Sequence, residues 1–149
     1  MREVEIRRKR YTRAVNVTTV SSAEALEDFA ENLAHTLEPG RVLILDGVMG
    51  AGKTTFTKGL ARGLGFTGEV TSPTYTYIHE YPTSKGTLAH IDAYQLEPKS
   101  RLWQMGLDEL LERSHLTVIE WGLEFVADLE NPLVVRFEVV AEGRRIIVE

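Results

Sequence analysis

Residues 41–55 read Arg-Val-Leu-Ile-Leu-Asp-Gly-Val-Met-Gly-Ala-Gly-Lys-Thr-Thr, and this stretch decides the fold. Val42 to Leu45 form a short apolar run that is typical of a strand. The pattern Gly-x-x-x-x-Gly-Lys-Thr then fills positions 47–54 and leads into a helical-looking segment, 56–64. A strand, a glycine loop and a helix in this order are the context that a phosphate-binding P-loop requires.

The residue types of this loop suit a polyphosphate. Its three glycines tolerate backbone angles that other residues resist, and they let the main chain approach an anion closely. A helix that begins near Lys53 adds unpaired N–H groups and the positive end of its dipole. Lys53 would reach the terminal phosphates and the Thr54 hydroxyl would hold magnesium, while Thr55 would cap the helix or contact another phosphate. The alternative is a glycine-rich turn that only enters a helix, and the flanking elements favour the phosphate loop.

Length and composition limit the class of protein. A chain of 149 residues predicts one domain, 1–149, in which residues 1–13 form a basic N-terminus that is flexible or contacts a partner. A net charge of -5 argues against a protein that grips nucleic acid by itself. The chain has no cysteine, and no apolar run approaches the length of a membrane span. We therefore expect a cytoplasmic protein without a membrane segment.

Hydrophobic periodicity predicts an α/β scaffold round the P-loop, with a mixed sheet flanked by helices. Residues 12–20 read as a strand, after which Ser21 or Ser22 caps a helix that ends near residue 39. Further strands are expected at 75–81 and 87–91. A helix is expected at 96–113, with a break at Gly106, and Met105 is expected to lie in the core face of this helix. Residues 133–140 and 144–148 predict a C-terminal antiparallel hairpin.

Two acids end apolar strands. Asp92 follows Leu88 to Ile91, and Glu120 follows Leu116 to Ile119. In open α/β sheets ligands gather at the carboxyl ends of the strands, so both carboxylates are placed to meet a metal ion and an attacking water. Acids also end strands by chance, but beside a P-loop the functional interpretation is favoured.

Three other features are ambiguous on local grounds. Ser72, Pro73 and Thr74 follow the first helix, where a switch-like loop often passes the terminal phosphate, or they form a hydroxyl-rich entrance to a strand. Trp121 either flanks the nucleotide or packs in the core. The histidines at 79, 90 and 115 have no paired metal ligands nearby in the sequence, which predicts structural roles.

Four motifs in this order make the chain resemble the TsaE (YjeE) family, the ATPase component of the bacterial machinery that makes threonylcarbamoyladenosine in tRNA. The similarity extends from about Thr18 to the terminal hairpin. It is carried by the P-loop, Ser72-Pro73-Thr74-Tyr75, His90-Ile91-Asp92-Ala93-Tyr94 and Val118-Ile119-Glu120-Trp121.

The resemblance implies roles for individual residues. Thr54 and Glu120 would hold Mg²⁺, and Lys53, Asp92 and Glu120 would serve hydrolysis. Adenine would sit between the start of the first helix and the terminal hairpin. The implied contacts to ATP or ADP are Gly50, Ala51, Gly52, Lys53, Thr54, Thr55, Ser22 and Arg144.

The resemblance also implies partners. The family works with the TsaB and TsaD subunits, so this protein would contact tRNA only indirectly, through the complex with these subunits. ATP turnover would reset that complex between rounds. Two positions depart from the family pattern, which usually has Asp at position 48 and Arg at position 95. Here Val48 lacks the carboxylate and Gln95 lacks the cation. These changes leave nucleotide binding intact and bear on the rate of hydrolysis and on partner contact.

Two other functions fit the same loop. A P-loop kinase for small molecules would place the phosphate on a metabolite, but it usually needs an arginine-rich lid that the sequence does not offer. A nucleotide-gated adaptor without hydrolysis would keep its activity after Asp92→Ala or Glu120→Ala. A small GTPase is disfavoured because no Asn-Lys-x-Asp sequence is present.

Overall fold

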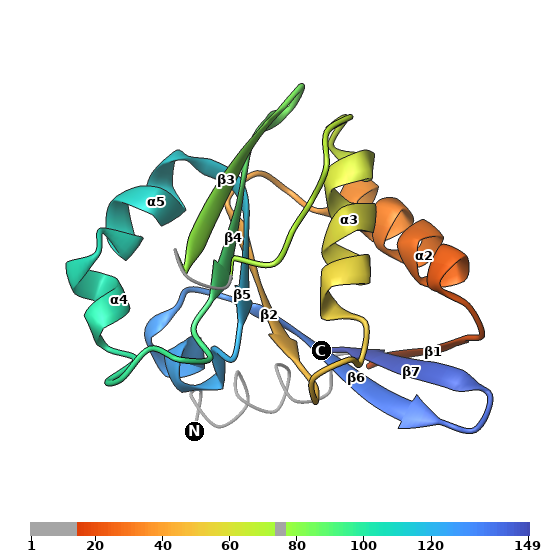
Figure 1. Cartoon of the computed structure of the whole chain (residues 1–149). Coiled ribbons are helices and arrows are strands. Elements are labelled where there is room, and N and C mark those ends of the chain that lie inside the picture. The colour runs from red at the N-terminus through yellow and green to blue at the C-terminus, as the bar shows by residue number, and fades with distance from the viewer. Residues whose placement is uncertain (1–14, 74–76) are drawn as a thin grey trace, which may run out of the picture.

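The computed structural model of the chain describes residues 15–73 and 77–149, and a seven-stranded sheet forms its centre (Figure 1). The strands are β1 (Asn16–Val20), β2 (Arg41–Asp46), β3 (Ile78–Thr83), β4 (Gly86–Asp92), β5 (Ser114–Glu120), β6 (Leu133–Val140) and β7 (Gly143–Val148). The helices are α2 (Ala23–Thr36), α3 (Lys53–Gly63), α4 (Arg101–Gln104), α5 (Leu107–Arg113) and the 3₁₀ helix η1 (Leu123–Asp128).

The sheet is mixed, with the order β1-β7-β6-β2-β5-β4-β3. Four neighbouring strands in its middle, β6, β2, β5 and β4, run parallel to one another. Strand β3 pairs antiparallel with β4 at one edge, and the β6–β7 hairpin with β1 forms the other side. The predicted fold class, including the terminal hairpin, is confirmed.

Strand β2 is buried on both faces, which explains its continuous apolar run. Leu43 and Leu45 belong to the core beneath α2 and α3, whereas Val42 and Ile44 belong to the core beneath α4, α5 and η1. Figure 1 shows the two helical layers on opposite sides of the sheet. Burial of each such side chain stabilises the fold by about 1.5–3 kcal/mol, so β2 holds both layers to the sheet.

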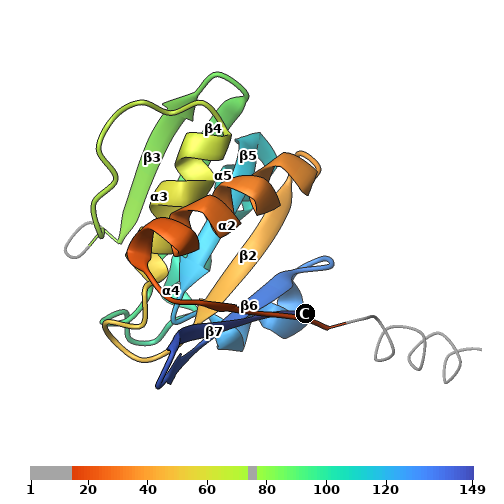
Figure 2. The ribbon, with the colours of Figure 1, turned by 90° about the vertical axis from the view of Figure 1, so that its right-hand side faces the viewer.

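Helices α2 and α3 pack closely against each other on one face (Figure 2). The Ser22 hydroxyl accepts a hydrogen bond of 3.0 Å from the N–H of Ala25 and so caps α2, as the sequence predicts. A Cβ added at Gly59 of α3 would lie 2.3 Å from the carbonyl oxygen of Glu27. The absence of a side chain at Gly59 therefore allows the middle of α3 to approach α2 closely.

The structure differs from the predictions in several places. The helix predicted for 96–113 begins only at Arg101, although it breaks at Gly106 as expected. Met105 is 43% exposed rather than part of the core, because it ends α4 just before Gly106 turns the chain with a φ of 92°. The predicted strands 12–20 and 75–81 are found as β1 and β3, which begin at Asn16 and Ile78, while residues 12–14, 75 and 76 lie outside the described residues. The basic segment 1–13 lies outside the described residues.

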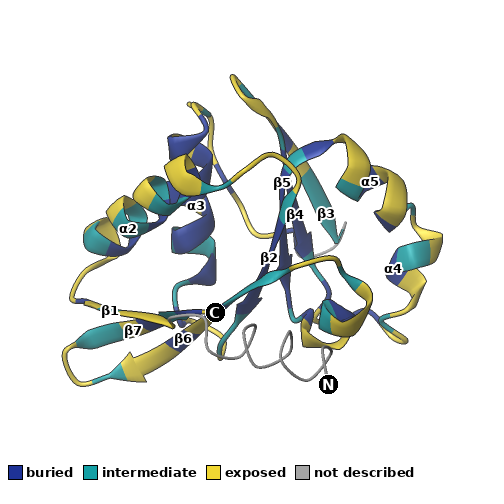
Figure 3. Cartoon of the chain, turned by 180° about the vertical axis from the view of Figure 1, so that it is seen from behind, coloured by how far each residue is buried: buried dark blue, intermediate teal, exposed yellow. Residues whose placement is uncertain are grey.

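The pattern of exposure follows these layers (Figure 3). Strands β2, β4 and β5 are largely buried. In β6 only Val135 and Phe137 are buried, and Val139, in the far half of the β6–β7 hairpin, is 57% exposed. Within residues 15–73 and 77–149, no helix is long and apolar enough to cross a membrane.

Candidate functional site

Parallel pairing brings the carboxyl ends of β2, β4 and β5 together. In the register of the sheet, Glu120 at the end of β5 lies opposite both Asp92 of β4 and Leu45 of β2. The P-loop follows β2 directly, so the two acids and the loop meet at one edge of the sheet. This is the arrangement that the sequence predicts for the carboxyl ends of the strands.

The loop itself needs its glycines. Gly50 has a φ of 79° and Gly52 a φ of 111°, both in the left-handed region. Gly52 precedes α3, and no side chain caps that helix. The first turn of α3 therefore presents main-chain N–H groups and the positive end of the helix dipole to whatever lies in front of the loop.

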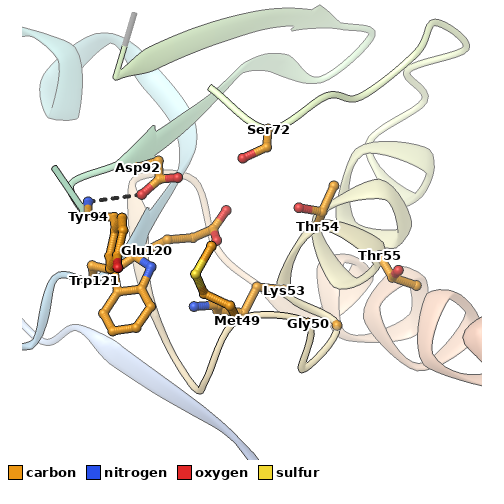
Figure 4. A pocket seen from close by; sticks show the side chains of 11 residues that line it. Met49, Gly50, Lys53, Thr54, Thr55, Ser72, Asp92, Tyr94, Glu120 and Trp121 are labelled. Atoms are coloured by element: carbon orange, nitrogen blue, oxygen red, sulfur yellow. Dashed lines mark hydrogen bonds between the residues drawn. The ribbon is translucent and has the colours of Figure 1, made fainter. Parts of the chain in front are cut away.

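A cleft of about 280 Å³ lies in front of the loop (Figure 4). The side chains of Thr54, Ser72, Asp92 and Glu120 point into the same space in this view, and Trp121 and Tyr94 stand at its side. These side chains come from α3, the 70–73 segment, β4, β5 and the turns after the two strands. Hydroxyl and carboxylate oxygens therefore line the cleft together, beside the P-loop.

Lys53 is the cation of this cleft, and only 6% of its surface is exposed. Its Nζ donates a hydrogen bond of 2.7 Å to the carbonyl oxygen of Gly47 and lies 4.1 Å from the centroid of the Trp121 ring. Burial lowers the pKa of Lys53, while the carboxylates of Glu120 and Asp92 raise it. The ammonium is therefore held between the loop carbonyl, the indole face and two acids, close to the phosphate position that the motif predicts.

Asp92 is oriented by its own turn. Its Oδ1 accepts a hydrogen bond of 3.0 Å from the N–H of Tyr94. Burial raises the pKa of Asp92, the N–H of Tyr94 lowers it, and the Glu120 carboxylate raises it. A carboxylate with a raised pKa accepts a proton from water more readily than an ordinary aspartate does.

Glu120 is 4% exposed and contacts His90, which is fully buried. The His90 Nε2 lies 2.5 Å from Oε2 of Glu120, so the ring donates a hydrogen bond to the carboxylate. The sequence predicts a structural role for His90 and does not connect this residue with Glu120. His90 and Asp92 are two residues apart in β4, and this period of two could have placed His90 on the same face as the acids.

Removal of this contact is expected to cost stability. In His90→Leu the buried Glu120 carboxylate loses its donor, which should lower the free energy of unfolding by about 1–3 kcal/mol. Urea denaturation monitored by circular dichroism measures the change. The matched control is His35→Ala, an exposed position at the end of α2, which should stay within about 0.5 kcal/mol of the original protein. Equal stability of His90→Leu would show that Glu120 does not depend on His90.

A second cavity of about 310 Å³ lies on the other side of the loop. It is lined by the start of α2, the P-loop and the start of β7, and includes Ser22, Thr55 and Arg144. The Ser22 hydroxyl already caps α2. Arg144 donates from Nε to the carbonyl oxygen of Ala51 at 3.1 Å and from Nη2 to that of Gly50 at 3.4 Å. Both residues thus border the place expected for a nucleoside.

The remaining predicted residues are placed as follows. Ser72 lines the first cleft, and Pro73 is buried beside it. Thr74, the third residue of the predicted switch-like loop, lies outside the described residues. Trp121 adopts a φ of 59°, and its ring lies 4.8 Å from that of Tyr94 and beneath the Lys53 ammonium, so it borders the cleft rather than the core.

Comparison with known proteins assigns the family. Residues 20–147 match the protein-family model described as "Threonylcarbamoyl adenosine biosynthesis protein TsaE". The chain belongs to the TsaE family. Relatives named "tRNA threonylcarbamoyladenosine biosynthesis protein TsaE" include one from Treponema pallidum, 37% identical over 83% of this chain and 92% of the relative. Another, from Bacillus subtilis, is 45% identical over 66% of this chain and 61% of the relative's length.

A solved structure supports the same assignment. The crystal structure titled "Crystal structure of Bacillus subtilus YdiB" matches with a TM-score of 0.73 and 32% identity, over 92% of this chain and 87% of that one. The fold of this TsaE protein is therefore that of a solved relative across nearly its whole length.

The two departures from the TsaE pattern lie on the surface near the cleft. Val48 is 63% exposed, and Gln95 is also exposed. Neither residue is among those that line the cleft. The described residues contain no group of three or more His, Asp or Glu side chains that could hold a metal ion. The Thr54 hydroxyl and one carboxylate nevertheless fit Mg²⁺, which takes few protein ligands and completes its shell with phosphate oxygens and water.

Proposed function

We propose that this TsaE protein is an ATPase that drives the enzyme complex making threonylcarbamoyladenosine in tRNA. The observation that carries the proposal is the meeting of Lys53, Thr54, Asp92 and Glu120 round one cleft at the P-loop. The TsaB and TsaD subunits are the partners, and the protein meets tRNA through them in the cytoplasm. ATP hydrolysis would reset the complex between rounds.

The triphosphate of ATP would lie in the cleft in front of the loop. Main-chain N–H groups of Gly50 and of residues 52–55 would bind its oxygens, while the N–H of Ala51 donates to the carbonyl oxygen of Val48. The dipole of α3 would favour the negative charge of the triphosphate. Lys53 would leave the carbonyl of Gly47 and bind the terminal phosphates as a point charge. The ribose and adenine would extend into the second cavity, between the start of α2 and the terminal hairpin.

Thr54 and Glu120 would hold Mg²⁺, with His90 fixing the carboxylate of Glu120 through the hydrogen bond to Oε2. When bound, the ion neutralises charge that develops on the phosphate oxygens. Because His90 already holds the Glu120 carboxylate, this side chain needs to move less when the nucleotide and the metal ion bind.

Asp92 would orient the attacking water and accept its proton. The water oxygen forms a bond to the γ-phosphorus as the bond between that phosphorus and the β-bridging oxygen breaks, which leaves ADP and inorganic phosphate. Lys53 would neutralise charge on the departing ADP. The loop of Ser72, Pro73 and Thr74 would sense the γ-phosphate and change position after hydrolysis.

Phosphate release with and without the purified partner subunits tests the proposal. The protein alone should turn over slowly, and the complete complex should raise the rate, because partners complete or order the site. Failure of every partner combination to stimulate release would contradict the proposal. Transfer of the γ-phosphate to a small molecule, with no release into solution, would instead support a kinase.

A further inference from the structure

We infer that Arg144 is a positioning residue of the phosphate loop, which orients the peptide groups of residues 50–52 and so sets affinity for phosphate rather than for the base. This inference rests on the proposed function for its ligand, because it concerns the same site. It differs from the sequence expectation that Arg144 contacts the nucleotide near adenine. The inference is based on the hydrogen bonds that the Arg144 guanidinium donates.

The guanidinium reaches three main-chain carbonyl oxygens. Nε lies 3.1 Å from the oxygen of Ala51, Nη2 lies 3.4 Å from that of Gly50, and Nη1 lies 3.0 Å from that of Gly143. Arg144 thereby joins the terminal hairpin to the P-loop across 93 positions of sequence. The planar fork of arginine places donors on three nitrogens toward acceptors that lie apart, whereas the donors of a lysine all sit on one nitrogen.

These contacts fix the orientation of two peptide planes. A trans peptide is planar, with its C=O and its N–H on opposite sides. Holding the oxygen of Ala51 toward Arg144 therefore turns the N–H of Gly52 the other way. The preceding plane is held at both ends, since the N–H of Ala51 also donates to the carbonyl oxygen of Val48 at 3.1 Å. Gly50 and Gly52 have left-handed φ angles, but glycine adopts many other backbone angles as readily, so the hydrogen bonds of these planes help to fix their orientation.

Arg144 is itself held firmly. Its backbone pairs with Val20 of β1 and with Val139 of β6. The preceding residue, Gly143, is packed so tightly that an added Cβ would lie 2.1 Å from the carbonyl oxygen of Val20. The hairpin is therefore a fixed support, and the guanidinium transmits its position to the loop.

The charge of Arg144 is directed at the loop as well. Arg145, the next residue, points to Glu138 on the surface, and Arg136 pairs with Asp46 and Glu149. In the described part of the chain, Arg144 makes no such ion pair, and its guanidinium donates to the carbonyl oxygens of Gly50, Ala51 and Gly143. Its positive charge thus adds to the potential that attracts a polyphosphate.

Titration calorimetry without magnesium tests this inference with ATP, GTP and inorganic tripolyphosphate. Arg144→Gln should weaken binding of tripolyphosphate and ATP by the same factor, about tenfold or more. Whichever affinity GTP has in the original protein should fall by that factor too. Arg144→Lys should recover only part of the loss, and the matched control Arg145→Gln should change nothing. A loss confined to ATP would assign Arg144 to the base and overturn the inference, as would unchanged affinity for all three ligands.

The amide resonance of Gly52 in ¹⁵N-labelled, nucleotide-free protein gives a second readout. It should shift in Arg144→Gln and stay in place in Arg145→Gln, with circular dichroism confirming that both variants are folded. An unmoved Gly52 resonance would contradict the positioning role. If the original protein bound neither ATP nor tripolyphosphate, the proposed function would fail, and the Gly52 resonance would still decide the role of Arg144.

Discussion

Lys53→Met is expected to weaken ATP binding roughly a hundredfold, because it removes the cation that meets the terminal phosphates. Two hydrogen bonds from an ammonium to charged oxygens at about 1.5 kcal/mol each give about 3 kcal/mol, which corresponds to that factor. Isothermal titration with ATP and Mg²⁺ measures the change. Lys58→Met is the matched control, since Lys58 lies on the same helix with an exposed side chain outside the cleft, and it should bind as the original protein does.

The same substitution should leave the fold as stable as before or more so. Burial lowers the pKa of Lys53, which means that the folded protein disfavours its charge. Methionine has a similar length and carries no charge into this site. Thermal unfolding of nucleotide-free Lys53→Met therefore separates lost binding from lost structure. Unchanged ATP affinity in a folded Lys53→Met variant would contradict the role given to Lys53.

Glu120→Gln is expected to lower the hydrolysis rate by about a hundredfold to a thousandfold, the range seen when one group that stabilises transition-state charge is removed. The amide keeps the shape of the carboxylate beside His90 but removes the negative charge that would hold Mg²⁺. The ATP affinity of the variant should therefore gain less from added magnesium than the affinity of the original protein.

Phosphate release in the presence of the partner subunits, together with ATP titrations at several magnesium concentrations, measures both effects. Glu124→Gln is the control, because Glu124 is an exposed acid on η1 and does not line the cleft. Hydrolysis at the original rate in Glu120→Gln would remove Glu120 from the reaction. Loss of hydrolysis with full activity of the tRNA-modifying complex would favour the nucleotide-gated adaptor.

Much of the fold could be predicted from local sequence patterns. The apolar run of 42–45 predicts a strand, and the structure confirms it as β2. The cores on both faces of β2 explain why the run is continuous. The Gly-x-x-x-x-Gly-Lys-Thr pattern fixes the loop and the start of α3, because few other residue types allow that turn. The acids at the ends of β4 and β5 meet because parallel strands end at the same edge.

The features of the fold and the site that the sequence did not predict depend on contacts between segments far apart in the chain. His90 and Glu120 are 30 residues apart, and their hydrogen bond follows from the register of β4 and β5, which no single motif specifies. Arg144 reaches the P-loop only because the terminal hairpin folds back beside β2. Met105 fits a helical stripe by spacing, but the turn at Gly106 takes it out of the core.

A crystal structure with Mg²⁺ and a non-hydrolysable ATP analogue tests the central claim most directly. The β- and γ-phosphates should lie within hydrogen-bonding distance of the N–H groups of Gly50 and of residues 52–55, and the Lys53 ammonium should have moved from the Gly47 carbonyl to the phosphates. The metal ion should be held by the Thr54 hydroxyl and the Glu120 carboxylate. A nucleotide bound elsewhere, or an empty cleft at saturating analogue, would contradict the claim.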